Sequence, residues 1–407
     1  MAERLRPENP EQLLETVLWA AGEEAPLEVI GAGSKRAIGR PATATHELDL
    51  SGLTGIALYE PNELVLGAAA GTPLAEIEAA LAAENQQLAF EPPDLGPLLG
   101  GKLGAQTIGG VVACNLSGPR RIKAGAARDH FLGLQAVSGR GEAFKAGGRV
   151  VKNVTGYDIC KLLAGSYGTL AVMSEVTVKV VPAPAKTRTV LVFGLSDEDA
   201  ARAMTASLTS THEVSGAAHL PQSISATSAV AYVAKAAGAV TALRIEGPQT
   251  SVEHRCASLR KALADFGESE ELHGHNSAQL WAEIGNVSVF AGEQERLIWR
   301  LSVPPSEGPA VAARITAKIA GEALYDWGGG LVWLAIDPLP DAGAPTIREA
   351  IAKSGGHATL IRAPLEMRAA TEVFQPQDSG AAGLTKRIKQ SFDPRRILNP
   401  GRMYEGV

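Results

Sequence analysis

The chain has 407 residues, of which 45% are hydrophobic and 20% charged, and its formal net charge is −6. This length accommodates two or three domains, and the composition is ordinary for a globular protein. The acidic net charge argues against a nucleic-acid partner. The sequence contains no run of eighteen apolar residues, so it predicts no membrane helix. Its three scattered cysteines predict neither a disulfide framework nor an iron–sulfur cluster held by this chain alone.

The N-terminal segment, residues 1–15, is charged and has no apolar centre, so the sequence predicts no signal peptide. We therefore expect a cytoplasmic protein, with any contact to the inner membrane peripheral and made through partners.

The first half alternates short strands with glycine-rich loops. Apolar spacing predicts helices over Pro10–Ala21 and Pro73–Glu84, the second capped by Thr72. Strands are expected at Leu27–Ile30, His46–Leu50, Gly55–Tyr59, Glu63–Ala68, Leu132–Val137, Ala143–Lys145 and Leu170–Val181.

The second half, from Lys186, predicts an antiparallel sheet with helices on one face, which is an α+β arrangement. Helices are expected at Glu198–Thr209, Val252–Phe266, Pro309–Ile319 and Thr346–Lys353. Strands are expected at Thr189–Phe193, Val230–Ala234, Ala239–Glu246, Leu297–Val303, Leu324–Trp327 and Leu331–Ile336.

Domain boundaries follow from these patterns. The Pro182–Pro184 segment ends the first domain, residues 1–182, and a second domain covers residues 186–380. Residues 381–407 form a helix and then an extended tail, and the Asn399–Gly401 turn is expected to bring that tail back to the first domain.

The first glycine loop follows the strand ending at Ile30. A dinucleotide fingerprint would need a third glycine where Arg36 stands and a helix after it, whereas Gly39 and Pro41 interrupt the segment. An anion-binding nest of inward-facing amides is the alternative, because glycines permit positive φ angles. Taken alone, so short a loop is better explained as a tight turn.

A second glycine-rich segment, Thr107–Gly118, places small residues where a bulky ligand would need a close backbone. Val151–Asp158 and Gly165–Val176 follow in order. Together these segments resemble the FAD-binding domain of the vanillyl-alcohol-oxidase type, also called the PCMH domain.

Further segments narrow the resemblance to the E subunit of bacterial glycolate oxidase. These are Gly33–Pro41, Glu91–Pro93, Gly118–Arg121, Asp326–Leu334, Ser354–Leu360 and Asn399–Tyr404. The resemblance implies a PCMH-type domain followed by a ferredoxin-like α+β domain. It also implies assembly with a second FAD-domain chain and an iron–sulfur subunit, oxidation of glycolate to glyoxylate, and electron transfer to the respiratory chain.

The resemblance implies a set of FAD contacts. The first pyrophosphate loop would be Gly31, Ala32, Gly33, Ser34 and Lys35, and the second Thr107, Gly109, Gly110, Asn115 and Gly118, with Arg121 beside it. Gly156, Tyr157 and Asp158 would lie near the isoalloxazine, and Ser166, Gly168, Thr169 and Glu175 near the adenosine.

The flavin is expected to be noncovalent. Related proteins that attach flavin use His or Cys in the first loop, where this chain has Ser34 and Lys35. Cys114 in the second loop is a less favoured alternative for attachment.

Catalytic candidates are weaker. Oxidation of a hydroxy acid needs a base and a cation for the carboxylate, for which His357, Tyr157 and Arg402 are candidates. Packing roles for His357 and Tyr157 remain open, as does a surface ion pair for Arg120 and Arg121. His273 and His275 form an HxH pair that we expect in a solvated loop, so no metal site is predicted.

Three functions therefore stand. The preferred one is an FAD-bearing oxidoreductase subunit whose flavin relays electrons or supports a partner, because no metal motif for the substrate is present. The alternatives are a flavin-free assembly subunit and a stand-alone FAD-dependent 2-hydroxy-acid dehydrogenase.

Overall fold

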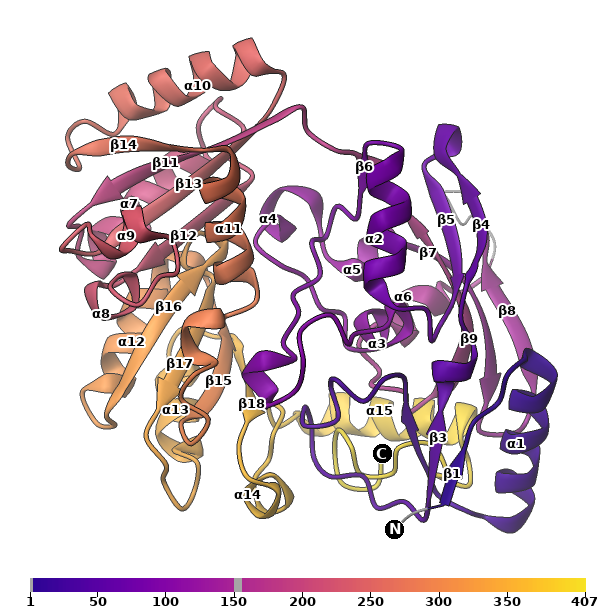
Figure 1. Ribbon diagram of the computed structural model, residues 1–407. Helices are drawn as coiled ribbons and strands as arrows, with labels where there is room; N and C mark the ends of the chain where they lie inside the picture. The colour runs from indigo at the N-terminus through magenta and orange to yellow at the C-terminus, as the bar shows by residue number, and fades with distance from the viewer. Residues whose placement is uncertain (1–2, 150–155) are drawn as a thin grey trace. The chain divides into compact units, whose positions relative to one another are not determined.

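A computed structural model of the chain describes residues 3–149 and 156–407 (Figure 1). It divides into two compact units. Unit 1 comprises residues 1–117, 125–183 and 376–407, and unit 2 comprises residues 118–124 and 184–375. The division lies close to Pro182, but the short segment Gly118–Ala124 belongs to unit 2.

Unit 1 contains a small parallel sheet and a larger antiparallel one. In the small sheet β3 (His46–Asp49) lies between β1 (Glu3–Leu5) and β2 (Leu27–Ile30). The larger sheet has the order β4-β5-β9-β7-β8, and every adjacent pair in it is antiparallel. Its strands are β4 (Ile56–Glu60), β5 (Val65–Ala69), β7 (Phe131–Ser138), β8 (Ala143–Gly147) and β9 (Ala171–Lys179).

The helices of unit 1 build two cores. One core packs α2 (Leu74–Ala83) and α3 (Ile108–Ala113) on the larger sheet, and the other packs α1 (Pro10–Glu23) on the small sheet. The remaining elements are η1 (Leu50–Gly52), η2 (Pro61–Glu63), β6 (Gln86–Gln87), η3 (Pro97–Leu99), α5 (Ala127–His130), α6 (Ile159–Leu163), β10 (Val181–Pro182) and α15 (Ser379–Phe392).

One expected cap is wrong. Thr72 does not cap α2, because its hydroxyl donates to the carbonyls of Ala69 and Gly55 instead, and Pro73 occupies the cap position. The hydroxyl therefore stabilises the turn after β5 rather than the helix.

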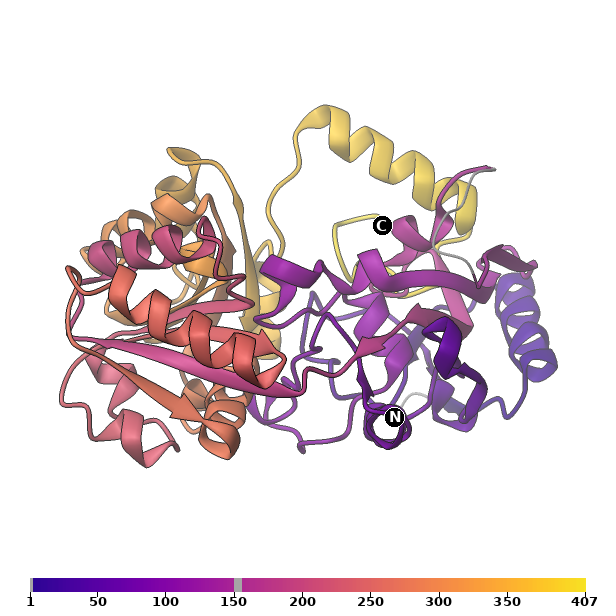
Figure 2. The same ribbon diagram turned by 90° about the horizontal axis from the view of Figure 1, so that it is seen from above.

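The C-terminal tail packs within unit 1. Helix α15, drawn in yellow, is followed by an extended segment (Figure 2). There Leu27 N donates to Ile397 O at 2.7 Å, and Asn399 N donates to Leu27 O at 2.9 Å. Ile397 and Leu398 are fully buried in the core formed with α1. The tail thus lies beside β2 and is joined to it at Leu27 by an isolated bridge.

Unit 2 is an eight-stranded antiparallel sheet covered by helices, which confirms the α+β class. The strand order is β14-β11-β13-β12-β16-β17-β15-β18. The strands are β11 (Lys186–Phe193), β12 (Gly216–Leu220), β13 (Val240–Gly247), β14 (Ser269–His273), β15 (Leu297–Ser302), β16 (Gly321–Asp326), β17 (Leu331–Ile336) and β18 (His357–Arg362).

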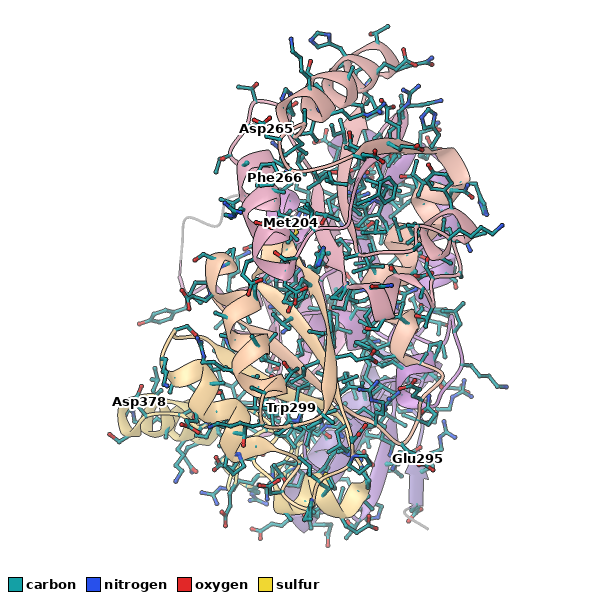
Figure 3. All side chains as sticks on the ribbon, turned by 90° about the vertical axis from the view of Figure 1, so that its left-hand side faces the viewer. Met204, Asp265, Phe266, Glu295, Trp299 and Asp378 are labelled. Carbon is teal, nitrogen blue, oxygen red and sulfur yellow. The ribbon has the colours of Figure 1, made fainter. Side chains whose placement is uncertain are left out.

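The helices cover both faces of this sheet, not one. α7 (Asp197–Leu208) and α10 (Gln249–Ala262) share a core that contains Val190, and Met204 and Phe266 pack in it (Figure 3). Thr189, the neighbour of Val190 on β11, points to the opposite face and accepts a hydrogen bond from Trp281 Nε1 of α11 (Gly274–Gly285).

The remaining elements of unit 2 are mostly short. They are α4 (Arg121–Ala124), α8 (Gln222–Ser225), α9 (Ala231–Ala234), η4 (Ser288–Phe290), η5 (Pro305–Glu307), α12 (Gly308–Thr316), η6 (Trp327–Gly329), α13 (Ala344–Ala352) and α14 (Leu365–Ala370). Trp299 of β15 is fully buried and donates from Nε1 to Ala342 O, just before α13 (Figure 3). None of the helices in the described parts of the chain combines the length and apolar character of a membrane span.

One expected strand in unit 2 is wrong. The segment expected as a strand at Val230–Ala234 is largely helix α9, and the strands that pair with β13 are β11 and β12. β12 has the sequence GAAHL, which carries no strand-favouring residue, but all five residues are buried. Tertiary packing therefore outweighs local propensity there.

Candidate functional site

Unit 1 contains a cavity between the end of β2, the start of α3 and the start of β9. Its empty volume is about 730 Å³, part of which opens to solvent. Three segments contribute most of its lining: Val29–Arg36, residues between Thr107 and Cys114, and residues between Tyr167 and Met173. Leu50, Ala70, and Asn399 and Arg402 of the tail complete it. Segments distant in sequence therefore meet at one site.

The first loop, residues 31–36, forms the mouth of the cavity. The backbone amides of Ala32, Gly33, Ser34 and Lys35 donate to no acceptor among the described residues. Gly33 has φ +75°, a value that glycine adopts without strain. Consecutive amides without acceptors beside a positive-φ residue form an anion-binding nest. The loop lacks a helix, as the sequence indicated, and still offers donors.

Gly31 is required for space rather than for its φ angle. A Cβ atom built on Gly31 would lie 2.4 Å from Thr107 Oγ1. Thr107 caps α3 and accepts from Gly110 N at 3.4 Å. A side chain on Gly31 would therefore push the first and second loops apart.

The second loop contributes packing more than free donors. Ile108 N already donates to Thr72 O at 3.1 Å, and Gly109 N donates to Ala70 O at 2.9 Å. A Cβ on Gly109 would lie 2.7 Å from Ala70 Cβ. The small residues here therefore let α3 approach β5 closely, and the cavity wall forms from that approach.

Lys35 brings a positive charge to the cavity. Its side chain is buried, and Nζ donates to Gln106 Oε1 at 3.1 Å. Burial lowers the pKa of this ammonium, and the nearby Cys114 and Asp94 oppose that effect. An anion in the cavity would supply the charge partner that the buried amine needs.

A third loop, residues 165–169, forms the opposite wall. Tyr167 has φ +54° and Gly168 has φ +68°. A Cβ on Gly168 would lie 2.8 Å from Asn399 Nδ2, which donates to Tyr167 O at 2.7 Å. Asn399 was not recognised as a site residue; the signal available for it was the Asn-Pro-Gly turn.

Arg402 lies behind the first loop. Its Nη2 donates to Lys35 O at 3.0 Å and to Arg36 O at 3.1 Å, and Nη1 donates to Glu28 Oε1 at 3.3 Å. The side chain is 7% exposed, and burial lowers its pKa. Arg402, a candidate for catalysis by sequence, thus bonds to the backbone of the first loop.

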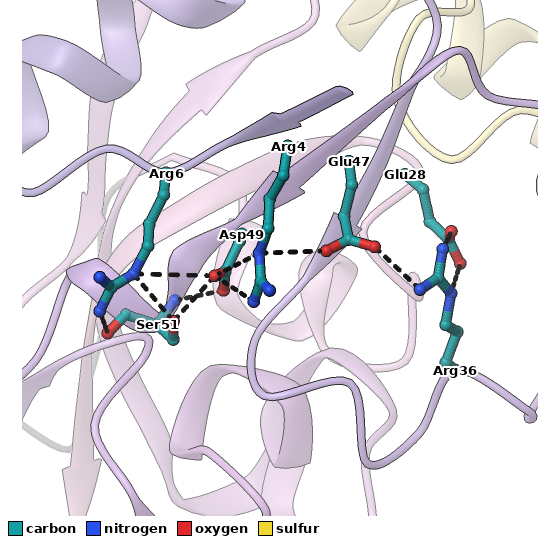
Figure 4. A network of polar contacts seen from close by, with 7 residues as sticks. All are labelled: Arg4, Arg6, Glu28, Arg36, Glu47, Asp49 and Ser51. Atoms are coloured by element: carbon teal, nitrogen blue, oxygen red, sulfur yellow. Dashed lines mark hydrogen bonds and ion pairs between the residues drawn. The ribbon is translucent and has the colours of Figure 1, made fainter. Parts of the chain in front are cut away.

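A chain of ion pairs crosses the small sheet outside the cavity (Figure 4). Arg36 contacts Glu28 and Glu47, Arg4 contacts Glu47 and Asp49, and Arg6 lies near Asp49. Asp49 is fully buried and also accepts from Ser51 N and Oγ. The side chain of Arg36 is therefore held among these carboxylates, although its residue borders the cavity.

The expected FAD contacts divide into two groups. Nine line the cavity: Gly31, Ala32, Gly33, Ser34, Lys35, Thr107, Gly109, Gly110 and Gly168. Nine others lie outside its lining: Asn115, Gly118, Arg121, Gly156, Tyr157, Asp158, Ser166, Thr169 and Glu175.

Several of the second group have local structural roles. Asn115 Oδ1 accepts from Arg128 N, Asp158 caps α6 through Lys161 N, and Glu175 on β9 accepts from Gln135 Nε2. Ser166 O accepts from Thr169 N and Oγ1. Tyr157 is 91% exposed, and Gly156 has φ +78°. The first part of the Val151–Asp158 segment, which includes Lys152, lies with residue 150 outside the described residues.

Gly118 and Arg121 belong to unit 2. Gly118 O accepts from Trp327 Nε1 at 3.0 Å, and the Arg121 guanidinium lies 4.2 Å from the centre of the Trp327 ring. Arg120 forms a two-point ion pair with Glu246. Burial would raise the pKa of Glu246, but Arg244 and then Arg120 outweigh it and lower that pKa to about 2. The ion-pair alternative therefore holds for Arg120.

His357 begins β18 at an edge of the sheet in unit 2. Partial burial of the imidazole lowers its pKa, and Arg300, Arg121 and Arg348 lower it further. A lowered pKa favours the neutral imidazole, which is the form that can accept a proton.

The HxH pair is exposed to solvent, as expected, but it does not lie in a loop. His273 ends β14 and His275 lies in the first turn of α11. In the described parts of the chain, no three His, Cys, Asp or Glu side chains lie together as metal ligands would.

The cavity as a whole fits one kind of ligand. The nest and Lys35 suit a dianionic pyrophosphate, while Leu50, Ala113, Val172 and Met173 offer apolar walls for an attached ring system. A dinucleotide such as FAD has both features.

Comparison with known proteins agrees with this fit. Residues 2–147 match the family described as FAD binding domain. FAD is therefore the cofactor of this chain, as the sequence indicated.

Two relatives cover much of the chain. It is 34% identical over 392 residues to the glycolate oxidase subunit GlcE of Escherichia coli (strain K12), covering 96% of each protein. It is 27% identical over 348 residues to the glycolate oxidase subunit GlcD of Bacillus subtilis (strain 168), covering 77% of this chain and 70% of that protein.

The fold also matches a solved structure. The 4-ethylphenol oxidase from Gulosibacter chungangensis superposes with a TM-score of 0.72 at 15% identity, covering 99% of this chain and 89% of that one. At that identity the match establishes the fold.

Proposed function

The chain belongs to the family of the glycolate oxidase subunit GlcE, and from this premise we propose that it is the FAD-binding subunit of a complex that oxidises glycolate to glyoxylate. The cavity in unit 1 carries the proposal, because a buried lysine lines it together with four adjacent amides that have no acceptor in the described parts of the chain.

We assign the pyrophosphate of FAD to the nest of the first loop. Ala32, Gly33, Ser34 and Lys35 donate their amides, and the Lys35 ammonium offsets one negative charge. Gly31, Gly109 and Gly168 keep the three loops close enough to form the wall.

The flavin is noncovalent in this proposal. Ser34 and Lys35 are not nucleophiles toward a flavin ring at neutral pH. Cys114 does line the cavity, but burial raises the pKa of its thiol. A protonated thiol is a poor nucleophile, so attachment at Cys114 is disfavoured.

Bound FAD supplies a hydride acceptor for the oxidation of a hydroxy acid. The residues of this chain would bind and orient the cofactor, with the pyrophosphate held at the first loop. His357 of unit 2, whose pKa is lowered by burial and by its arginine neighbours, is the candidate proton acceptor if this chain itself oxidises the substrate.

We favour a relay or supporting role for this flavin over direct turnover. The described residues gather no metal ligands for a hydroxy acid. The similarity to GlcD indicates that a second chain of this fold serves as a glycolate oxidase subunit, so that chain is the proposed partner, with an iron–sulfur subunit as electron acceptor. Membrane contact, in this proposal, is peripheral and through partners.

The test uses the chain purified alone and the complex captured from its source cells. We expect an oxidised-flavin spectrum from the chain alone, with dye-linked glycolate oxidation only in the complex. Robust turnover by the chain alone would favour the stand-alone dehydrogenase. A colourless chain that still completes an active complex would favour the flavin-free assembly subunit.

A further inference from the structure

The C-terminal tail contacts two walls of the FAD cavity. Its residues Asn399 and Arg402 line the cavity, and each bonds to the backbone of a loop. We propose that Asn399 and Arg402 are positioning residues that set the separation of the first and third loops, so that FAD binding requires a docked tail. The inference rests on FAD occupying this cavity and not on the substrate of the complex.

Arg402 controls the first loop. Two carbonyls that follow the nest, Lys35 O and Arg36 O, accept from the same Nη2 atom. A peptide unit is planar, so holding Lys35 O and Arg36 O fixes the planes of the two peptides that directly follow the last nest amide, Lys35 N. Glu28 of β2 accepts from Nη1 and fixes the guanidinium in turn.

The position of Arg402 is itself fixed by the backbone. Arg40 N donates to Arg402 O at 2.9 Å, and Arg402 N donates to Asn399 O at 3.1 Å. A Cβ on Gly39 would lie 3.0 Å from Arg402 O, so the chain beyond the first loop wraps closely around this residue. We call the two bonds from Arg402 Nη2 to Lys35 O and Arg36 O the carbonyl clamp. Movement of the tail would therefore move this clamp.

Asn399 joins the other two elements. Its Oδ1 accepts from Val29 N at 2.8 Å, at the strand that leads into the first loop, and its Nδ2 donates to Tyr167 O at 2.7 Å in the third loop. The side chain is 3% exposed and the residue has φ +44°. One amide group thus spans the two walls, and asparagine tolerates this backbone conformation better than most residues.

Lys389 anchors the tail to the same wall. Its Nζ donates to Thr169 O at 2.7 Å and to Leu398 O at 2.9 Å. The third loop is therefore held at Tyr167 by Asn399 and at Thr169 by Lys389. By reciprocity, FAD that holds the loops must also strengthen tail docking.

A matched pair of variants tests the inference. Arg402→Gln removes the carbonyl clamp, whereas Arg395→Gln removes a tail arginine that bonds to the carbonyls of Ala21 and Gly22, away from the cavity. We expect FAD affinity, measured by quenching of flavin fluorescence, to fall at least about tenfold for Arg402→Gln and to change little for Arg395→Gln, since a hydrogen bond to a charged group contributes roughly one to two powers of ten.

Asn399→Ala and a structural readout complete the test. Asn399→Ala should weaken FAD binding as well, and hydrogen exchange should slow at the amides of residues 32–35 and in the tail together when FAD binds the wild type. Equal loss of affinity in Arg395→Gln would overturn the positioning role of Arg402, since tail stability alone would then explain the effect. Wild-type affinity in Arg402→Gln would overturn it too. A wild-type chain that bound no FAD would instead refute the proposed function.

Discussion

The Lys389 ammonium and the Asp393 carboxylate lie 2.8 Å apart and are almost completely buried, at 1% and 0% exposure. Lys389 comes from the last turns of α15 and Asp393 follows the helix. The carboxylate also accepts from Ile397 N and Leu398 N, so the pair connects the helix to the extended tail. Each N–H group of the Lys389 ammonium donates to an oxygen atom. A buried ion pair is tolerated when its hydrogen bonds are satisfied in this way.

Lys389→Met should destabilise unit 1 markedly. The substitution leaves Asp393 buried without its counter-charge, and breaking a buried pair from one side costs about 3–5 kcal/mol. Lys386→Met, at an exposed position of the same helix, should cost far less. Urea unfolding measures both. Similar midpoints for the two variants would contradict a structural role of the pair.

Gly31→Ala should weaken FAD binding. The added methyl group would lie 2.4 Å from Thr107 Oγ1 and would push the first loop away from α3. Gly22→Ala is the control: it lies in α1, and a Cβ there meets nothing within 4 Å. That variant should bind FAD normally and gain roughly 0.5–1 kcal/mol of helix stability. Isothermal titration with FAD and thermal unfolding separate the two effects. Unchanged affinity in Gly31→Ala would refute the close approach.

Local chemistry explains what the sequence predicted well. The strand at Leu27–Ile30 depends on neighbouring residues, namely an apolar run that ends at a glycine, and the structure has β2 at those same bounds. The tail's return to unit 1 was likewise indicated by its Asn-Pro-Gly turn.

Long-range contacts account for what the sequence could not predict. Asn399 becomes a site residue only through bonds to Val29 and Tyr167, which lie 370 and 232 residues away along the chain. The assignment of Arg121 to a phosphate loop overlooked that residues 118–124 pack with Trp327 in unit 2. No local pattern carries either contact, because both depend on which segments the fold brings together.

Cys114→Ser should retain FAD, and all flavin should leave the wild-type protein on acid precipitation. The raised pKa of the thiol keeps it protonated, so it does not attack the flavin at neutral pH. The measurement is flavin fluorescence in the precipitated protein against that in the supernatant. Fluorescence that stayed with the wild-type chain but not with Cys114→Ser would show that attachment occurs.

Tyr325→Phe should reduce the stability of unit 2 at neutral pH by about 1 kcal/mol. The Tyr325 hydroxyl donates to Asp197 Oδ2 at 2.6 Å, and His219 also contacts this carboxylate. Burial opposes these bonds, but they outweigh it and hold the pKa of Asp197 below 3.8. A carboxyl with a lowered folded pKa stabilises above its unfolded pKa and loses that contribution as the pH falls through the folded value.

The difference between Tyr325→Phe and the wild type should therefore shrink in acid. Urea unfolding of both proteins at neutral pH and near the pKa of Asp197 checks this. A difference that stayed constant with pH would mean that the hydroxyl acts through packing and not through the carboxylate.

FAD affinity should fall as the pH rises in the alkaline range, through Lys35. Burial lowers the pKa of this amine below 10.5 in the free protein, whereas the FAD phosphates favour the ammonium and raise it. Binding therefore takes up a proton between the two pKa values, and affinity declines across that window. The sign is opposite for folding. The unfolded chain binds more protons than the FAD-free folded chain between their two pKa values, so the FAD-free protein gains stability as the pH rises.

Lys35→Met should bind FAD more weakly at neutral pH and lose the decline of affinity with pH, while Lys102→Met, at an exposed lysine, should keep that decline. Titrations of FAD over the alkaline range decide the matter, and a slope that persisted in Lys35→Met would place the titrating group elsewhere.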